Sequence, residues 1–167
     1  MQEQIEAITV REMFSSDRSF LTEMLYQAIF IPPGEAPAGR DILEIPEIHR
    51  YEENWGRMGD FALVAEKECE SFPNIKAGLL WIRYFPADAP GYGFIDETIP
   101  ELSIAIKPEF RGRGIGSLLL KTLLARPNPG YSSISLSVDS VNPAVRLYQR
   151  FGFTKCGETG KSLIMRW

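Results

Sequence analysis

The sequence predicts a mixed α/β fold in a single domain that covers residues 1–167. Segments with the alternating apolar pattern of strands are interspersed with segments whose apolar residues recur at helical spacing. A strand, a glycine-rich turn and a helix follow one another without a break in Glu101–Leu124. A length of 167 residues also suits one domain with its own hydrophobic core.

The N-terminal segment predicts a strand and a helix. Ile5–Arg11 has a weak strand pattern. Ser15, Ser16 and Asp17 are residue types that favour the N-cap of a helix. The apolar residues within Phe20–Ile29 recur at helical spacing, so a first helix of about three turns is expected there.

The next part of the chain predicts a loop, a short helix and a hairpin. Residues 31–46 are rich in proline and glycine and predict an extended loop. A second short helix is expected from about Pro46 to Trp55, closed by Gly56. Phe61–Glu66 and Ile75–Phe85 predict a hairpin, and the second of these is expected to be a central strand because it is apolar on both faces.

The segment Glu101–Leu124 carries the first functional motif. Alternation through Glu101–Lys107 predicts a strand that Pro108 ends. Arg111–Gly116 reads Arg-Gly-Arg-Gly-Ile-Gly and leads directly into a helix. The first N–H groups of a helix have no intrahelical partner, and glycines without a Cβ let a ligand approach them closely. Two arginines add positive charge, so the segment favours a phosphate-bearing ligand. The spacing fits neither the nucleotide P-loop nor the dinucleotide fingerprint G-x-G-x-x-G.

A second motif lies downstream. Ser133–Val138 alternates as a strand, and Asn142 followed by Pro143 is typical of a helix start. The helix that follows has one apolar stripe and reaches a Gly-Phe pair. Phe153–Gly157 and Ser162–Trp167 predict two final strands, expected as an antiparallel pair.

Together the two motifs resemble the GNAT superfamily of N-acetyltransferases. The matching patterns are Arg-x-x-Gly-x-Gly after a strand, and Asn-x-x-Ala-x-x-Leu-Tyr before Gly-Phe, both within Glu101–Phe153. The resemblance implies a twisted mixed sheet of about six to seven strands, flanked by helices on both faces. It also implies that the strands at 101–107 and 133–138 splay apart to admit the pantetheine arm of acetyl-CoA.

The resemblance further implies which residues form the site. Those expected to bind acetyl-CoA are Ile104, Ala105, Ile106, Arg111, Gly112, Arg113, Gly114, Ile115, Gly116, Ser117 and Asn142. Tyr148 matches the family tyrosine that protonates the departing thiolate. Glu101 lies where many members carry a catalytic glutamate, although Glu97, Asp96 or an ordered water remain open as the base.

The implied activity is transfer of the acetyl group to a primary amine, directly within a ternary complex. Neither cysteine lies in a motif that indicates an acyl-enzyme. Two alternatives remain open: a catalytically silent acyl-CoA-binding sensor or interaction domain, and a transferase of a longer acyl group. The acceptor is expected to be a small-molecule or peptide amine, and the sequence leaves open whether the protein forms a homodimer.

Composition excludes several other classes. A net charge of −4 gives no support for nucleic acid as a partner. With Cys69, Cys156 and the single histidine His49 far apart in the sequence, no metal site is expected. No signal pattern and no membrane-spanning apolar run occur, and two isolated cysteines fit a reducing compartment, so a cytoplasmic location is expected.

The acceptor pocket is expected to draw on residues 25–45, residues 81–97 and the final strands. Its aromatic candidates are Tyr26, Phe30, Trp55, Tyr84, Tyr92 and Phe94. The proline-rich loop 31–46 is a candidate lid. Residues 31–60 are rich in acidic side chains, which predicts a solvated face or, alternatively, an entrance that favours cationic amines.

Overall fold

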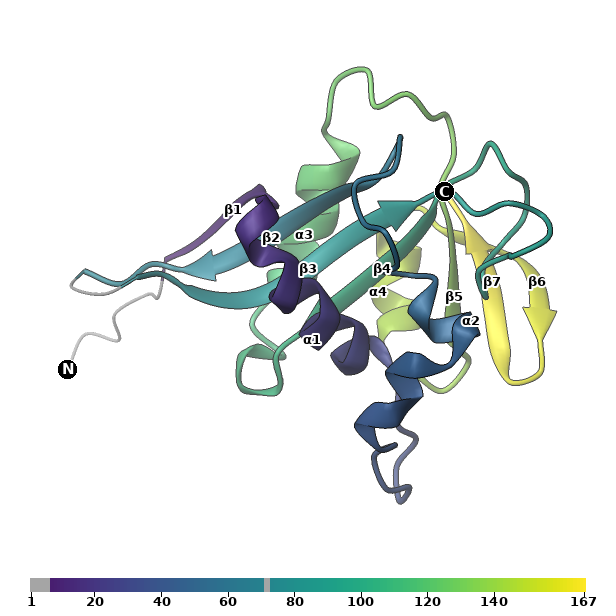
Figure 1. The fold of residues 1–167 in the computed structure, drawn as a ribbon, viewed down its shortest axis with the longest axis horizontal. Coiled ribbons are helices and arrows are strands. Elements are labelled where there is room, and N and C mark those ends of the chain that lie inside the picture. The colour runs from purple at the N-terminus through teal and green to yellow at the C-terminus, as the bar shows by residue number, and fades with distance from the viewer. Residues whose placement is uncertain (1–6, 71–72) are drawn as a thin grey trace.

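A seven-stranded mixed sheet is the centre of the structure, a computed structural model that describes residues 7–70 and 73–167 (Figure 1). The strand order is β1-β2-β3-β4-β5-β7-β6. The strands are β1 (Ile8–Glu12), β2 (Phe61–Lys67), β3 (Ile75–Arg83), β4 (Glu101–Ile106), β5 (Ser135–Asp139), β6 (Thr154–Thr159) and β7 (Ser162–Arg166). The β4 and β5 strands are parallel, whereas every other neighbouring pair is antiparallel. The predicted mixed α/β class is therefore confirmed.

Helices cover both faces of the sheet, as expected. The helical segments are η1 (Ser15–Asp17), α1 (Arg18–Ala28), η2 (Arg40–Glu44), α2 (Pro46–His49), η3 (Pro108–Phe110), α3 (Ile115–Leu124) and α4 (Ala144–Arg150). In Figure 1, α1 lies in front of the sheet while α3 and α4 lie behind it. The order of strands and helices predicted along the chain is confirmed.

The β3 strand separates two hydrophobic clusters, one on each face of the sheet. Leu79 and Trp81 pack with the buried residues of α1. Leu80 and Ile82 alternate with them and pack with the buried residues of α3. The prediction of a central strand that is apolar on both faces is correct, and so is the hairpin that joins it to β2.

The second helix is shorter than predicted. It ends at His49, and separate turns continue the chain to Trp55, including hydrogen bonds from the N–H groups of Glu52 and Glu53 to the His49 carbonyl. Asn54 has φ of 49°, a left-handed conformation that breaks the helical path. The predicted helix over Pro46–Trp55 is therefore a short helix followed by turns.

The N-terminal strand and cap also differ from the prediction. Strand β1 begins at Ile8, and the predicted residues 5 and 6 lie outside the described part of the chain. Asp17 makes no side-chain cap to α1. Its carboxylate instead pairs with Arg11 at 2.7 Å and with Lys76 at 2.5 Å, so long-range ion pairs replace the predicted N-cap.

Strands β4 and β5 contact each other only at their start. Glu101 and Ser135 are the one register pair, and the Ser135 N–H donates to the Pro100 carbonyl at 3.0 Å. Beyond this point β5 continues in register with β7, and β4 continues in register with β3. The two parallel strands thus separate toward their carboxyl ends, as the motifs implied.

Candidate active site

The glycine turn before α3 has the backbone conformation that its residues predict. Gly112 and Gly114 have φ of 73° and 78°, which only glycine adopts at low cost. A Cβ on either would meet no atom within 4 Å, so the space above the turn is open. The α3 helix begins at Ile115, directly after the N-cap Gly114, which leaves its first N–H groups without intrahelical partners.

Two arginines border this turn. The Arg111 Nε donates to the Ile106 carbonyl at 3.0 Å, which ties the side chain to the end of β4. The Arg113 guanidinium lies over the Phe110 ring at 5.5 Å from its centroid. Both arginines lie within four residues of the start of α3, so they bring positive charge to the segment where the helix dipole also favours an anion.

The edge of β4 that faces the gap presents backbone hydrogen-bonding groups. The Pro100 carbonyl points to β5, and backbone direction alternates along a strand. The N–H and C=O groups of Ile104 and Ile106 therefore face the gap, whereas the backbone of Ala105 faces β3. Of the three residues predicted to bind the pantetheine arm, Ile104 and Ile106 have the suitable direction.

Glu101 provides a buried carboxylate at the point where β4 and β5 meet. It is only 4% exposed. The Tyr51 hydroxyl donates to its Oε1 at 2.5 Å, and within the described chain its Oε2 has no hydrogen-bond partner. Burial raises the pKa of Glu101 to about 7, while hydrogen bonding from Tyr51 and from the Gly93 backbone acts to lower it. Glu101 can therefore exchange a proton near neutral pH.

The other two candidate bases, Asp96 and Glu97, are exposed and accept hydrogen bonds within the β3–β4 loop. Asp96 Oδ1 accepts hydrogen bonds from the N–H and the hydroxyl of Thr98. Glu97 Oε1 accepts a hydrogen bond from the Ala87 N–H at 2.7 Å. Of the three acidic candidates for the base, Glu101 alone is buried.

Tyr148 lies on α4, behind the sheet. It packs edge-on against Phe153, with ring centroids 5.8 Å apart, in the cluster that includes Leu102 of β4 and Leu136 of β5. Burial raises the pKa of Tyr148 to about 12, so its hydroxyl stays protonated at neutral pH. Because Tyr148 packs in the cluster of Leu102, which follows Glu101 in β4, Tyr148 and Glu101 lie on opposite faces of the sheet.

Asn142 begins the second motif as predicted. Its Oδ1 accepts a hydrogen bond from the Ala144 N–H at 2.9 Å, so the side chain caps α4 although Pro143 is the last residue before the helix. A cavity of about 440 Å³ lies beside it. The cavity is lined by Ser140, Val141, Asn142, Pro143, Val145, Arg146 and Gln149.

Of the aromatic candidates for the acceptor pocket, Tyr92 contacts the surroundings of Glu101, because its ring stacks on Tyr51. Tyr26 donates from its hydroxyl to the Ala38 carbonyl. Three further candidates have other positions. Trp55 lies under the Arg83 guanidinium, Phe94 packs with the α1 cluster, and Tyr84 lines a separate cavity of about 520 Å³.

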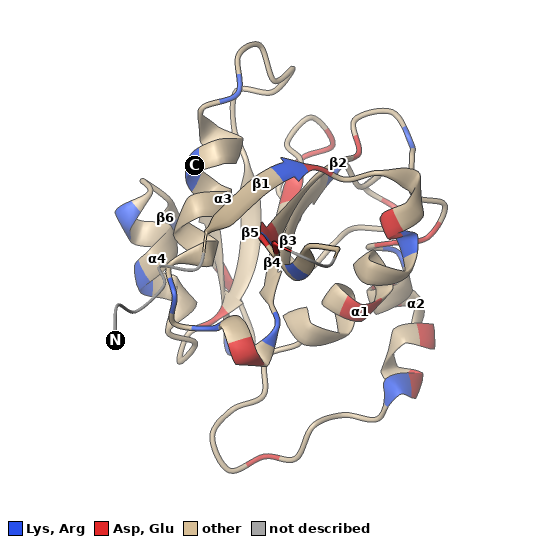
Figure 2. Cartoon of the chain, turned by 90° about the vertical axis from the view of Figure 1, so that its left-hand side faces the viewer, with Lys and Arg blue, Asp and Glu red and all other residues tan. Residues whose placement is uncertain are grey.

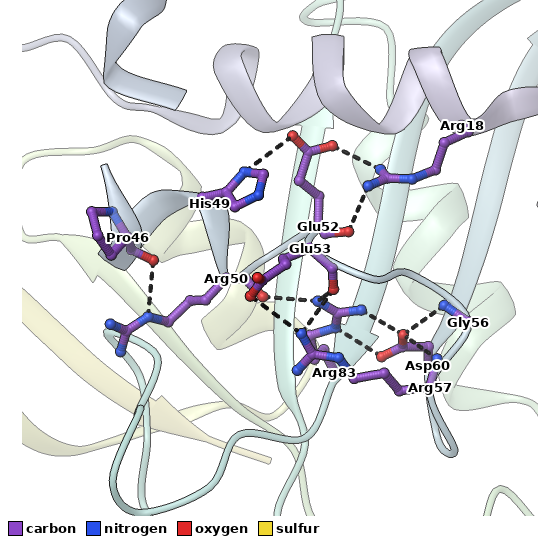
Figure 3. A network of polar contacts seen from close by, with 10 residues as sticks. All are labelled: Arg18, Pro46, His49, Arg50, Glu52, Glu53, Gly56, Arg57, Asp60 and Arg83. Carbon is purple, nitrogen blue, oxygen red and sulfur yellow. Dashed lines mark hydrogen bonds and ion pairs between the residues drawn. The ribbon is translucent and has the colours of Figure 1, made fainter. Parts of the chain in front are cut away.

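Two of the acidic residues of 31–60 form ion pairs with arginines of the scaffold. Glu52 pairs with Arg18, and Asp60 pairs with Arg83 (Figure 3). These two carboxylates stabilise the scaffold. Figure 2 shows acidic and basic residues interspersed over several elements of the described chain, not separated onto two faces.

Sequence reasoning did not find three residues around Glu101. Tyr51 was part of the predicted second helix, Phe85 was placed in a strand, and Ser135 was one serine of an alternating strand. The structure brings Tyr51 and Phe85 together, with ring centroids 4.9 Å apart. The Ser135 hydroxyl is buried in register with Glu101 and has no partner within the described residues.

The family model described as an acetyltransferase (GNAT) domain matches residues 61–155, which include the glycine turn, Glu101 and Tyr148. The chain belongs to this GNAT family.

Relatives of this GNAT domain include longer proteins. It is 28% identical to a mycothiol acetyltransferase of Corynebacterium aurimucosum over 116 residues, which are 66% of the chain and 36% of that protein. The chain spans about a third of the length of this curated relative.

Solved structures show the same GNAT fold. The Salmonella typhimurium protein yncA, solved with its cofactor acetyl-CoA, matches with a TM-score of 0.65 and 20% identity over 96% of this chain and 93% of that one. A protein from Acinetobacter baylyi ADP1 matches with a TM-score of 0.70 and 16% identity, over 98% and 93% of the two chains.

Two further observations concern metals and membranes. Among residues 7–70 and 73–167, no group of three or more His, Cys, Asp or Glu side chains is arranged to hold a metal ion. No helix in the same ranges has the length and apolar character needed to cross a bilayer.

Proposed function

We propose that this GNAT domain transfers the acetyl group of acetyl-CoA to a primary amine, directly within a ternary complex. The observation that carries the proposal is the buried Glu101 carboxylate, which lies where β4 and β5 separate and has one oxygen without a partner. Residues that suit a phosphate-bearing cosubstrate lie on the same strand-turn-helix unit. The acceptor amine and the acetyl group of acetyl-CoA would thus meet at the end of the gap where Glu101 lies.

The residues present fit acetyl-CoA. The open turn at Gly112 and Gly114, the first N–H groups of α3, and the side chains of Arg111 and Arg113 suit the pyrophosphate. The backbone groups of Ile104 and the N–H group of Ile106, which face the gap, suit the amide groups of the pantetheine arm. Burial of these polar groups against the ligand would satisfy them.

Glu101 would act as the general base. An alkylammonium acceptor has a reference pKa near 10.4 and must lose a proton before its nitrogen can attack the thioester carbon. The buried carboxylate accepts that proton as the N–H bond breaks, and the nitrogen lone pair becomes available. An N–H group of β4 at the gap is suited to donate to the oxyanion.

Tyr148 would act as the general acid. Its hydroxyl remains protonated at neutral pH, because burial raises its pKa to about 12. As the carbon–sulfur bond breaks, the hydroxyl donates its proton to the thiolate, and CoA leaves as the thiol. The second proton that the nitrogen loses on forming the amide restores the Tyr148 hydroxyl. Neither Cys69 nor Cys156 is required, so the acyl group passes directly to the amine.

The experiment is release of CoA thiol from acetyl-CoA across a panel of amines, with Tyr148→Phe beside the wild type. We expect amine-dependent release that falls about a hundredfold or more in the variant, while the acetyl-CoA Kd changes little. Tyr131→Phe is the matched control, since it removes a tyrosine hydroxyl from a residue that lines the separate cavity beside Tyr84. Equal turnover of Tyr148→Phe and wild type would remove Tyr148 from the mechanism. Binding of acetyl-CoA without release on any amine would favour a binding domain instead.

A further inference from the structure

The hydroxyl of Tyr51 is held in one direction. It accepts a hydrogen bond from the Tyr92 N–H at 2.7 Å and donates to Glu101 Oε1 at 2.5 Å. A phenol has a single proton to donate. Because the Tyr92 N–H lies on its acceptor side, that proton points to the carboxylate.

The Tyr51 ring is also fixed by its neighbours. It is 6% exposed, packs against Phe85, and stacks on Tyr92 with an interplanar angle of 15°. Burial and the nearby Glu101 carboxylate raise the pKa of Tyr51 well above its ordinary value, so the phenol stays neutral. Tyr51 is thus a rigid, neutral donor.

The backbone that carries Tyr51 is anchored to the sheet through Arg83 (Figure 3). The Arg83 Nη1 donates to the carbonyls of Arg50 and Glu53, both at 2.8 Å. Its Nε and Nη2 bind the two carboxylate oxygens of Asp60 at 2.9 and 2.6 Å. Arg83 is paired with Glu101 in the β3–β4 register. The β3–β4 pair therefore positions both the Glu101 carboxylate and the backbone that carries its donor, Tyr51.

The groups around Glu101 come from four elements. Tyr51 follows α2, Tyr92 and Gly93 belong to the β3–β4 loop, Arg83 lies on β3 and Ser135 lies on β5. Arg83 is committed to Asp60, and the groups that shift the pKa of Glu101 are burial, the Tyr51 hydroxyl and the Gly93 N–H. The tyrosine hydroxyl is therefore the main group that favours the ionised carboxylate.

We propose that Tyr51 is a positioning residue for Glu101: its hydroxyl occupies Oε1 and leaves Oε2 as the oxygen that takes the proton from the acceptor amine. This inference rests on the proposed function. In the step, the ammonium N–H bond breaks, an O–H bond forms at Oε2, and the nitrogen keeps the electron pair with which it attacks. The hydrogen bond from Tyr51 also keeps Glu101 ionised at a lower pH than burial alone would allow.

The test is Tyr51→Phe, which keeps the ring packed on Phe85 and removes only the hydroxyl. On the acidic side of the pH profile, we expect kcat/KM for the amine to fall at a pH about one to two units higher than in the wild type. The reason is that the ionised carboxylate has lost a hydrogen bond. At high pH, where Glu101 is ionised in both proteins, kcat/KM should return to within a few-fold of wild type. Tyr131→Phe is the control, because Tyr131 lines the separate cavity beside Tyr84, and it should leave the pH profile of kcat/KM unchanged.

A second readout does not depend on activity. The pKa of Glu101 is followed by the ¹³C chemical shift of its carboxyl group in the wild type and in Tyr51→Phe. An unchanged carboxyl titration would overturn the inference, even if the amine-dependent activity is present. A shifted titration without acetyl transfer to any amine would instead retain the role of Tyr51 and overturn the proposed function.

Discussion

Gly91 lies against the carboxylate of Glu101. A Cβ on Gly91 would come 2.1 Å from Oε2 and 2.9 Å from Phe85 Cε2. Oε2 is the oxygen that lacks a hydrogen-bond partner within the described chain. The loop therefore leaves this oxygen room only because residue 91 has no side chain.

Gly91→Ala is accordingly expected to impair catalysis. The added methyl group must displace either the loop or the carboxylate, and a displacement of about 1 Å can lower a rate about a hundredfold. The measurement is kcat/KM for the amine, together with the Kd for acetyl-CoA, which should change little. Gly157→Ala on β6 is the control, because its new Cβ would make only ordinary contacts with Ile164 at 3.6 Å or more. Full activity of Gly91→Ala would show that the Glu101 geometry is not required.

Ionisation of Glu101 is expected to destabilise the fold as the pH rises. Its pKa is about 7 in the folded protein against an ordinary 4.5, so between these values the folded state holds a proton that the unfolded chain has lost. The free energy of unfolding therefore decreases with rising pH through this window, by roughly 3 kcal/mol from this group.

Glu101→Gln removes this dependence while its side-chain oxygen can still accept from Tyr51. Thermal unfolding is measured from about pH 5 to pH 8 for both proteins. The wild-type Tm should fall more steeply across this range than the Tm of the variant. Parallel curves for the two proteins would contradict a raised pKa at Glu101.

The buried ion pair between Arg83 and Asp60 is expected to contribute strongly to stability. Both side chains are almost fully buried, at 1% and 3% exposure. Arg83→Met would leave the Asp60 carboxylate buried without its cation and release the carbonyls of Arg50 and Glu53, at a cost of about 3–5 kcal/mol. Urea unfolding gives this difference in the free energy of unfolding.

The matched control is Arg40→Met. Arg40 forms an ion pair with Glu23 of the same chemistry, at 2.6 Å, but its side chain is 60% exposed. Its loss should cost about 1 kcal/mol or less. Similar costs for the two substitutions would mean that burial does not set the contribution of the Arg83 pair.

The motifs could be predicted because their signals are local. Gly112 and Gly114 adopt the left-handed backbone that glycine favours, and Asn142 caps the helix that it precedes. The β2–β3 hairpin and the apolar faces of β3 follow from short-range periodicity. In these cases the residues that specify the structure are close together in sequence.

The environment of Glu101 could not be predicted because it depends on distant contacts. Tyr51 reaches Glu101 across 50 positions of sequence, and Arg83 reaches Arg50 across 33. Asp17 has the residue type of an N-cap, yet its ion pairs with Arg11 and Lys76 replace that role. The secondary-structure propensity of a residue does not indicate which side chains the fold will bring next to it.

The start of α3 leads to a last prediction, which concerns the phosphate groups of the cosubstrate. If Arg113 supports the pyrophosphate, Arg113→Ala should raise the Kd for CoA about tenfold, since charge-assisted hydrogen bonds are lost. The same substitution should leave the Kd for acetyl-pantetheine unchanged, because that probe lacks the pyrophosphate. The salt dependence of CoA binding should also become weaker. Isothermal titration calorimetry of both ligands at two salt concentrations measures these effects.

Arg150→Ala at the end of α4 is the control for net charge. Arg150 is exposed, as Arg113 is, but it lies in the last turn of its helix and not at the start of one. Both substitutions remove one positive charge, so a general electrostatic effect would raise the Kd for CoA equally in the two variants. A larger effect for Arg113→Ala that disappears with acetyl-pantetheine would assign the charge at the glycine turn to the pyrophosphate. Equal effects in the two variants, or an equal loss of affinity for both ligands, would place the pyrophosphate elsewhere.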